Sequence, residues 1–138
     1  MKILIDTNII VDVALDRDPF FAASEQVLRF VEQQRVEGYI SASTFSDLYY
    51  IIRKTKGHTW TIQFLQGIAT FCQVATVNQA TISMALASNF KDFEDAIVYG
   101  AAVINNLDAI VTRNQKDFPV TTPRILTPEQ LIQELTSS

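Results

Sequence analysis

The chain has 138 residues, of which 48% are hydrophobic and 19% are charged, and its formal net charge is −4. These values fit a folded protein of ordinary composition, and we expect residues 1–138 to form a single domain. The negative charge argues against a protein that binds nucleic acid over a wide basic face, but a nuclease is still compatible because catalytic carboxylates add negative charge.

Short apolar runs alternate with longer stretches of helical periodicity. The first run, Lys2–Ile5, contains no turn former and predicts a buried strand. Further strands are expected over 38–40, 73–77, 109–112 and 123–126, and helices over 20–36, 41–53, 59–71, 79–88, 92–106 and 128–135. This alternation predicts an α/β fold in which helices cover both faces of a parallel sheet.

Oxygen-bearing side chains fall where predicted strands end or predicted helices begin. Four segments supply them: Asp6; Asp47; Asp92 with Asp95; and Asn114 with Asp117. Ligands of open parallel sheets bind beyond the carboxyl ends of the strands, so we expect these groups to share a pocket. Gathered carboxylates repel one another unless they are neutralised, and oxygen ligands without His or Cys suit Mg²⁺ or Mn²⁺. The residues therefore indicate metal-assisted phosphoester hydrolysis.

Each acid also has a structural interpretation that needs no metal. Asp6 fits the N-cap of a helix starting near Asn8, and Asp47 fits a capping box with Thr44. Asp92 fits an ordinary N-cap, which we favour over metal ligation at that position. Asp95 could instead interact favourably with the dipole of its helix. Asp117 could instead lie in a polar turn.

Several other classes of site are disfavoured by the residue inventory. His58 is the only histidine and is expected in a loop between helices, which argues against a zinc site and a Ser-His-Asp triad. No glycine-rich phosphate-binding motif is present. A HAD-type phosphatase also opens with an Asp after its first strand, but it requires a second Asp where this chain has Asn8.

The compartment and the surface can also be anticipated. Cys72 is the only cysteine, so no intrachain disulfide can form, and no apolar run approaches the roughly 18 residues that span a bilayer. We therefore expect a cytoplasmic protein. The segment Tyr49–Ile52 makes its helix apolar on most sides, which predicts burial within the fold or at a dimer contact. The basic residues that follow suit a solvated helix end or, as a second interpretation, contact with an RNA backbone: Arg53, Lys54 and Lys56.

Four motifs occur in order along most of the chain. They are ILIDTN at 3–8, STFSDL at 43–48, DFEDA at 92–96 followed by Ala101-Ala102, and IVTRN at 110–114 followed by KDF at 116–118. This ordered set resembles PIN-domain proteins, specifically the small prokaryotic type related to VapC toxins. The resemblance implies a three-layer α/β/α fold with a central parallel sheet. It also implies a Mg²⁺- or Mn²⁺-dependent endoribonuclease that cleaves RNA, is silenced as a toxin by an antitoxin protein and forms a homodimer.

The resemblance also assigns site residues. Its three core acids, which hold metal and orient water, correspond to Asp6, Asp47 and Asp95. Asp117 corresponds to a more variable metal ligand, and the supporting positions are Asn8, Asp92, Thr112 and Asn114. Two departures stand out, because Asp47 occupies a position where the family more often has Glu, and Asn114 replaces an acid. These departures leave open a PIN-like module that binds proteins without catalysis.

Overall fold

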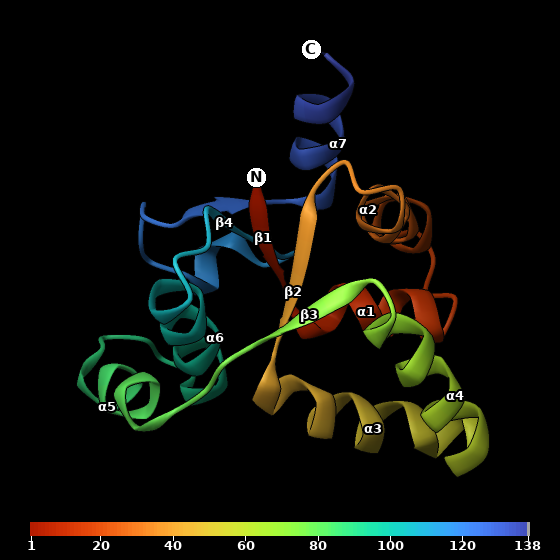
Figure 1. Ribbon diagram of the computed structural model, residues 1–138, viewed down its shortest axis with the longest axis horizontal. Coiled ribbons are helices and arrows are strands. Elements are labelled where there is room, and N and C mark those ends of the chain that lie inside the picture. The colour runs from red at the N-terminus through yellow and green to blue at the C-terminus, as the bar shows by residue number, and fades with distance from the viewer. Residues whose placement is uncertain (138) are drawn as a thin grey trace.

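A central five-stranded sheet organises the computed structural model, which describes residues 1–137 (Figure 1). All four strand pairs are parallel, and the strand order is β3-β2-β1-β4-β5. The strands are β1 (Lys2–Ile5), β2 (Glu37–Ser41), β3 (Cys72–Ala75), β4 (Ala109–Val111) and β5 (Arg124–Leu126). The predicted parallel α/β sheet is confirmed, and β5 lies at one edge of it.

Helices cover both faces of this sheet, which gives the expected three-layer α/β/α fold (Figure 1). They are α1 (Thr7–Ala14), α2 (Phe21–Glu32), α3 (Ala42–Lys56), α4 (His58–Ala69), α5 (Gln79–Ala87), α6 (Phe93–Ile104) and α7 (Pro128–Thr136). Ile3 and Ile5 of β1 pack into one hydrophobic cluster with residues of α1, α2, α3 and α7, whereas Leu4 packs into the other with α6. Burial on both faces explains why this strand is an unbroken apolar run.

The strand order reverses at β1, which has β2 on one side and β4 on the other. Asp6 follows β1 directly, and its backbone N–H continues the ladder by donating to the Val111 carbonyl over 3.0 Å. Thr112 follows β4 in the same way. The ends of the two central strands therefore lie side by side at the switch point where α/β sheets bind ligands.

Two local predictions are wrong. The N-cap of α3 is Ser41, whose hydroxyl lies 2.9 Å from that of Ser43, and Thr44 lies within the first turn of the helix. No capping box between Thr44 and Asp47 forms. His58 is the first residue of α4 rather than part of a loop, because Gly57 alone makes the turn with φ of 81°.

The apolar segment of α3 is only partly covered. Tyr50 is 56% exposed and Ile51 is 38% exposed, so burial of this helix on two faces within the fold is wrong. A dimer contact at this surface stays a prediction. Among residues 1–137, no helix is long and apolar enough to cross a membrane.

Candidate active site

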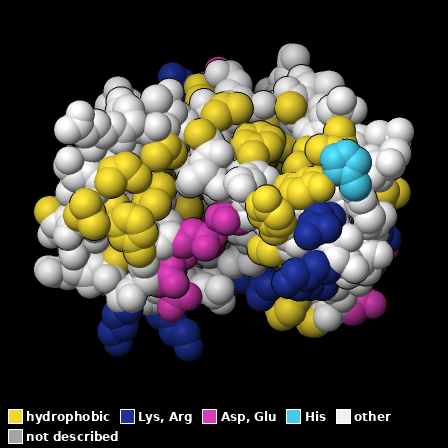
Figure 2. Space-filling model, turned by 90° about the horizontal axis from the view of Figure 1, so that it is seen from below, with side chains coloured by type: hydrophobic (Ala, Val, Ile, Leu, Met, Phe, Trp, Pro, Cys, Tyr) yellow, Lys and Arg dark blue, Asp and Glu magenta, His cyan; other side chains and the backbone are white. Residues whose placement is uncertain are grey.

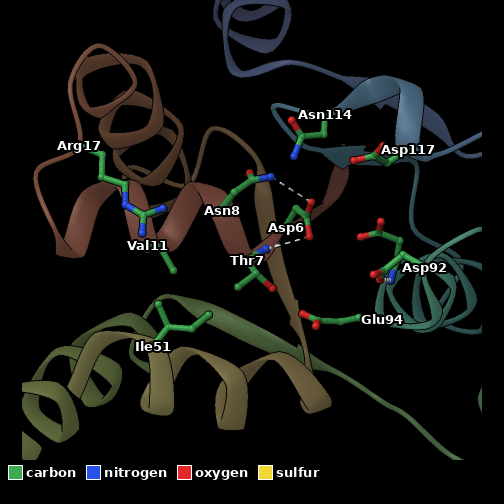
Figure 3. Close-up of a pocket in the computed structure, with 11 residues that line it drawn as sticks. Asp6, Thr7, Asn8, Val11, Arg17, Ile51, Asp92, Glu94, Asn114 and Asp117 are labelled. Atoms are coloured by element: carbon green, nitrogen blue, oxygen red, sulfur yellow. Dashed lines mark hydrogen bonds between the residues drawn. The ribbon is translucent and has the colours of Figure 1, made fainter. Parts of the chain in front are cut away.

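A pocket of about 310 Å³ opens at the carboxyl edge of the sheet (Figure 3). Its walls are formed by Asp6, Thr7, Asn8, Val11, Arg17, Ile51, Asp92, Glu94, Asp95, Asn114 and Asp117. Six of the residues predicted from the sequence therefore line one pocket: Asp6, Asn8, Asp92, Asp95, Asn114 and Asp117. The other two predicted residues, Asp47 and Thr112, do not line it.

Asp6 is almost fully buried, with only 6% of its surface exposed, and several hydrogen bonds hold its carboxylate in place. One carboxylate oxygen caps α1 by accepting from the Thr7 backbone N–H at 2.9 Å. The other oxygen accepts from the Thr112 hydroxyl at 2.8 Å and from the Asn8 amide at 3.4 Å. Burial raises the pKa of Asp6, and the hydrogen bonds from Thr112 and Thr7 oppose this rise. The N-cap interpretation is thus confirmed, and the same carboxylate lines the pocket.

The loop after β4 is tied to α1 through the same hydroxyl. Thr112 is fully buried, and its Oγ1 accepts from the Asn114 backbone N–H at 3.1 Å while donating to Asp6. The Asn8 amide nitrogen lies 3.5 Å from this oxygen. Thr112 therefore supports the pocket from behind and sets the direction of the chain at Asn114.

A buried ion pair fixes this loop from its outer side. Asp12 of α1 has no exposed surface, and its carboxylate accepts from Arg113 Nε at 2.8 Å, from Arg113 Nη2 at 3.2 Å and from the Ser24 hydroxyl at 3.0 Å. The Arg113 guanidinium also lies 3.9 Å from the centre of the Phe20 ring. This pair was not predicted from the sequence. The available signal was an acid inside the apolar run of residues 9–13, because a buried carboxylate requires a charged or hydrogen-bonding partner.

The opposite wall is the first turn of α6. Asp92 is the N-cap of this helix and accepts from the Asp95 backbone N–H at 3.0 Å, as predicted, yet it also lines the pocket. Burial, followed by the negative charges of Asp6 and other acids in the pocket, raises the pKa of Asp95 to about 7. This side chain therefore loses its proton only near neutral pH in the metal-free protein.

Glu94 links this wall to α3. Burial and the neighbouring Asp47, through its charge and a side-chain hydrogen bond, raise the pKa of Glu94 to about 7. In Figure 3 Glu94 extends toward Thr7 and Asp6. Asp47 thus contacts Glu94, which lines the pocket, but Asp47 does not line the pocket itself. Glu94 was not predicted from the sequence, although its place in the first turn of a helix between two candidate acids was a usable signal.

The chemistry of the pocket fits a hard divalent cation. Five acids line it, namely Asp6, Asp92, Glu94, Asp95 and Asp117, and their mutual repulsion contributes to the raised pKa of Asp95. Within the described residues, no three Asp, Glu, His or Cys side chains lie close enough to hold one ion together. The acids therefore share a pocket without meeting at a single point. Carboxylate oxygens are the ligands that Mg²⁺ and Mn²⁺ prefer in proteins.

Comparisons with known proteins agree with this architecture. Residues 2–116 match the PIN domain family. Ribonuclease VapC1 from Aquifex aeolicus (strain VF5) is 23% identical over 137 residues, which cover 96% of this chain and 94% of that protein. A toxin–antitoxin complex from Klebsiella pneumoniae contains a similar chain, with a TM-score of 0.69, 24% identity and coverage of 91% of this chain and 96% of that one. DNA-bound VapBC from Salmonella typhimurium has a TM-score of 0.68 at 17% identity, covering 93% and 98% of the two chains.

Proposed function

The chain belongs to the PIN-domain family, and on that premise we propose that it is a Mg²⁺- or Mn²⁺-dependent endoribonuclease that hydrolyses RNA phosphodiester bonds. The observation that carries this proposal is the convergence of five carboxylates from β1, α6 and the β4–β5 connection on one pocket at the carboxyl edge of the sheet. The name of the related ribonuclease from Aquifex aeolicus supports it.

Each part of the pocket has a role in this proposal. Asp6, Asp95 and Asp117 would hold the ion partly through its water ligands, because no three acids among residues 1–137 meet at one point, and Glu94 would contribute with Asp47 behind it. A divalent ion at these acids would supply Lewis-acid chemistry toward the phosphodiester and would make a nearby water easier to deprotonate. Thr112 and Asn8 keep the Asp6 carboxylate in a fixed orientation. Asp95 is our candidate for accepting the proton of the attacking water, because its carboxylate lies in the same pocket as Asp6 and Asp117.

We further propose that the protein is the toxin of a toxin–antitoxin pair, acts in the cytoplasm as a homodimer, and consists of one domain. The names of the structural relatives, which are toxin–antitoxin complexes, support the antitoxin partner. A PIN-like module that binds proteins without catalysis is the second candidate. The position of Asp47 outside the pocket wall favours it, since one core acid of the family then lies apart from the others.

RNA cleavage by the purified protein tests the proposal. We expect single-stranded RNA to be cleaved in Mg²⁺ or Mn²⁺ and to stay intact in EDTA. Asp6→Asn and Asp95→Asn should each lower the rate by at least about 100-fold, because metal affinity depends on these carboxylates and their orientation. Glu129→Gln, which removes an exposed acid at the start of α7, is the matched control. Cleavage by Asp95→Asn at the wild-type rate would refute the assignment.

Calorimetry separates the two candidates. A catalytic pocket should bind Mn²⁺ with an affinity that Asp95→Asn weakens, whereas Glu129→Gln should bind it like the wild type. A protein that binds an antitoxin but neither Mn²⁺ nor RNA would be the non-catalytic module.

A further inference from the structure

We propose that the RNA strand leaves the acidic pocket through a second groove, in which Lys91 and Lys116 bind a phosphate next to the scissile one. This inference rests on the proposed ribonuclease function and adds a part of the substrate path to it. The groove has a volume of about 770 Å³ and is lined by Asn89, Lys91, Asp92, Asp95, Lys116, Asp117 and Pro119.

The groove is continuous with the acidic pocket. Asp92, Asp95 and Asp117 line both cavities, so these acids form the boundary between them. A chain that places one phosphate at the acids therefore reaches the groove with the next part of its backbone. No other segment needs to move to open this path, because the groove is already present.

The two lysines are free to bind an anion. Lys91 lies just before α6 and Lys116 lies in a short 3-10 helix after β4 (Gln115–Asp117), so two separate segments place them in one groove. Both side chains are exposed. Neither forms an ion pair with any described residue, although acids line the same groove. Figure 2 shows a row of Asp and Glu side chains in magenta on this face of the molecule. Lys or Arg side chains in dark blue project beyond the lower end of that row.

Charge explains why RNA needs such contacts here. The protein carries a net charge of −4 and the pocket is lined by five acids, so a phosphate backbone is repelled wherever no cation offsets them. The pocket itself offers one cation, Arg17, on the side away from α6 (Figure 3). The lysine groove supplies positive charge on the α6 side, so that a strand crossing the acids meets a cation before and after them.

The next hollow along this path has a different character. Asn89 and Pro119 line both the lysine groove and an adjoining hollow of about 360 Å³, whose walls include Met84, Phe90 and Tyr99. The Phe90 and Tyr99 rings are 5.1 Å apart. The path thus changes from carboxylates to ammonium groups and then to aromatic and apolar side chains. A nucleotide presents a phosphate and then a base, and bases stack on aromatic side chains.

The test is the salt dependence of RNA cleavage by the full-length protein. We expect Lys91→Ala/Lys116→Ala to raise KM for single-stranded RNA about tenfold at 50 mM salt, with kcat unchanged. Neutralisation of one phosphate of a single strand contributes about 0.7 to the slope of log affinity against log salt, so the double variant should lower that slope by about 0.7. Lys91→Arg/Lys116→Arg should keep the wild-type KM and slope.

The control variant is Lys2→Ala/Arg29→Ala, which removes the same charge from exposed positions that line neither cavity. If the lysine variant had the KM and the salt slope of this control, the groove would not bind RNA and the proposal would be overturned. If the wild-type protein cleaved no RNA, the proposed function would fail and the groove proposal with it. The wild-type reaction reveals that second failure before any variant is compared, so the two failures are distinguishable.

Discussion

The two sides of the pocket are built in opposite ways. On the side of β1 and β4, Asp6 is almost fully buried and accepts hydrogen bonds from Thr7, Asn8 and Thr112. On the α6 side, Glu94 and Asp95 are less buried, and burial together with the neighbouring carboxylates raises the pKa of both to about 7. Hydrogen bonds within the protein therefore stabilise the carboxylate on the first side. On the second side, the carboxylates repel one another and no group among the described residues neutralises their charge. A bound cation would act mainly on the second side.

The largest expected effect on stability comes from breaking the ion pair between Arg113 and Asp12, which lies on the side of β1 and β4. Arg113→Ala removes the charged partner of Asp12, which has no exposed surface and keeps only the Ser24 hydroxyl. An uncompensated buried charge costs about 3–5 kcal/mol, and because Arg113 is partly exposed we expect a loss of about 3 kcal/mol. Urea denaturation measures this free energy of unfolding.

A second substitution shows whether the charge is the cause. Arg113→Ala/Asp12→Leu removes both charges and should be less destabilised than Arg113→Ala alone, because no buried charge is left unpaired. Equal stability of the two variants would mean that lost packing, rather than charge, explains the change.

A smaller effect on the same side is expected for Thr112→Val, which keeps the shape of the side chain and removes its hydroxyl. Asp6 and the Asn114 N–H each lose a partner. An unsatisfied buried group costs about 1–3 kcal/mol, so unfolding should become easier by about that amount. Cleavage should also fall about 10- to 100-fold, as for groups that orient metal ligands. Thr70→Val, on the surface, is the control; a Thr112→Val protein as stable and active as this control would contradict the prediction.

The smallest effect belongs to the repelling side and has the opposite sign. In the folded, metal-free protein the pKa of Asp95 is about 7 instead of the ordinary 3.8, so between these values the folded state binds more protons than the unfolded state. Stability is therefore greatest at low pH within this window and falls as the pH rises through about 7. Denaturation in EDTA at pH 5, 6, 7 and 8 should give this trend, and Asp95→Asn should weaken it and raise stability at pH 8 by about 1 kcal/mol. A stability that rises from pH 5 to pH 8 would contradict this account.

The fold could be predicted from the sequence because its signals are local. Ile3, Leu4 and Ile5 form an apolar run without a turn former, and such runs between helical stretches specify a parallel sheet. The approximate place of the acids followed from one rule, that functional groups gather at the carboxyl ends of parallel strands.

What could not be predicted depends on contacts between distant elements. Whether Asp47 lines the pocket depends on how α3 is rotated against α6. In the structure Asp47 contacts Glu94, and Glu94 lines the pocket in its place. The pairing of Asp12 with Arg113 joins residues that are 101 positions apart. No periodicity within either segment carries that information.

The adjacency of β1 and β4 has a consequence for the order of events during protein synthesis. Asp6 and its partner Thr112 are 106 positions apart, so the first exists long before the second is translated. A nascent chain holds no assembled pocket until β4 has emerged from the ribosome and paired beside β1. Translation itself thus delays the completion of this pocket until most of the chain has been made.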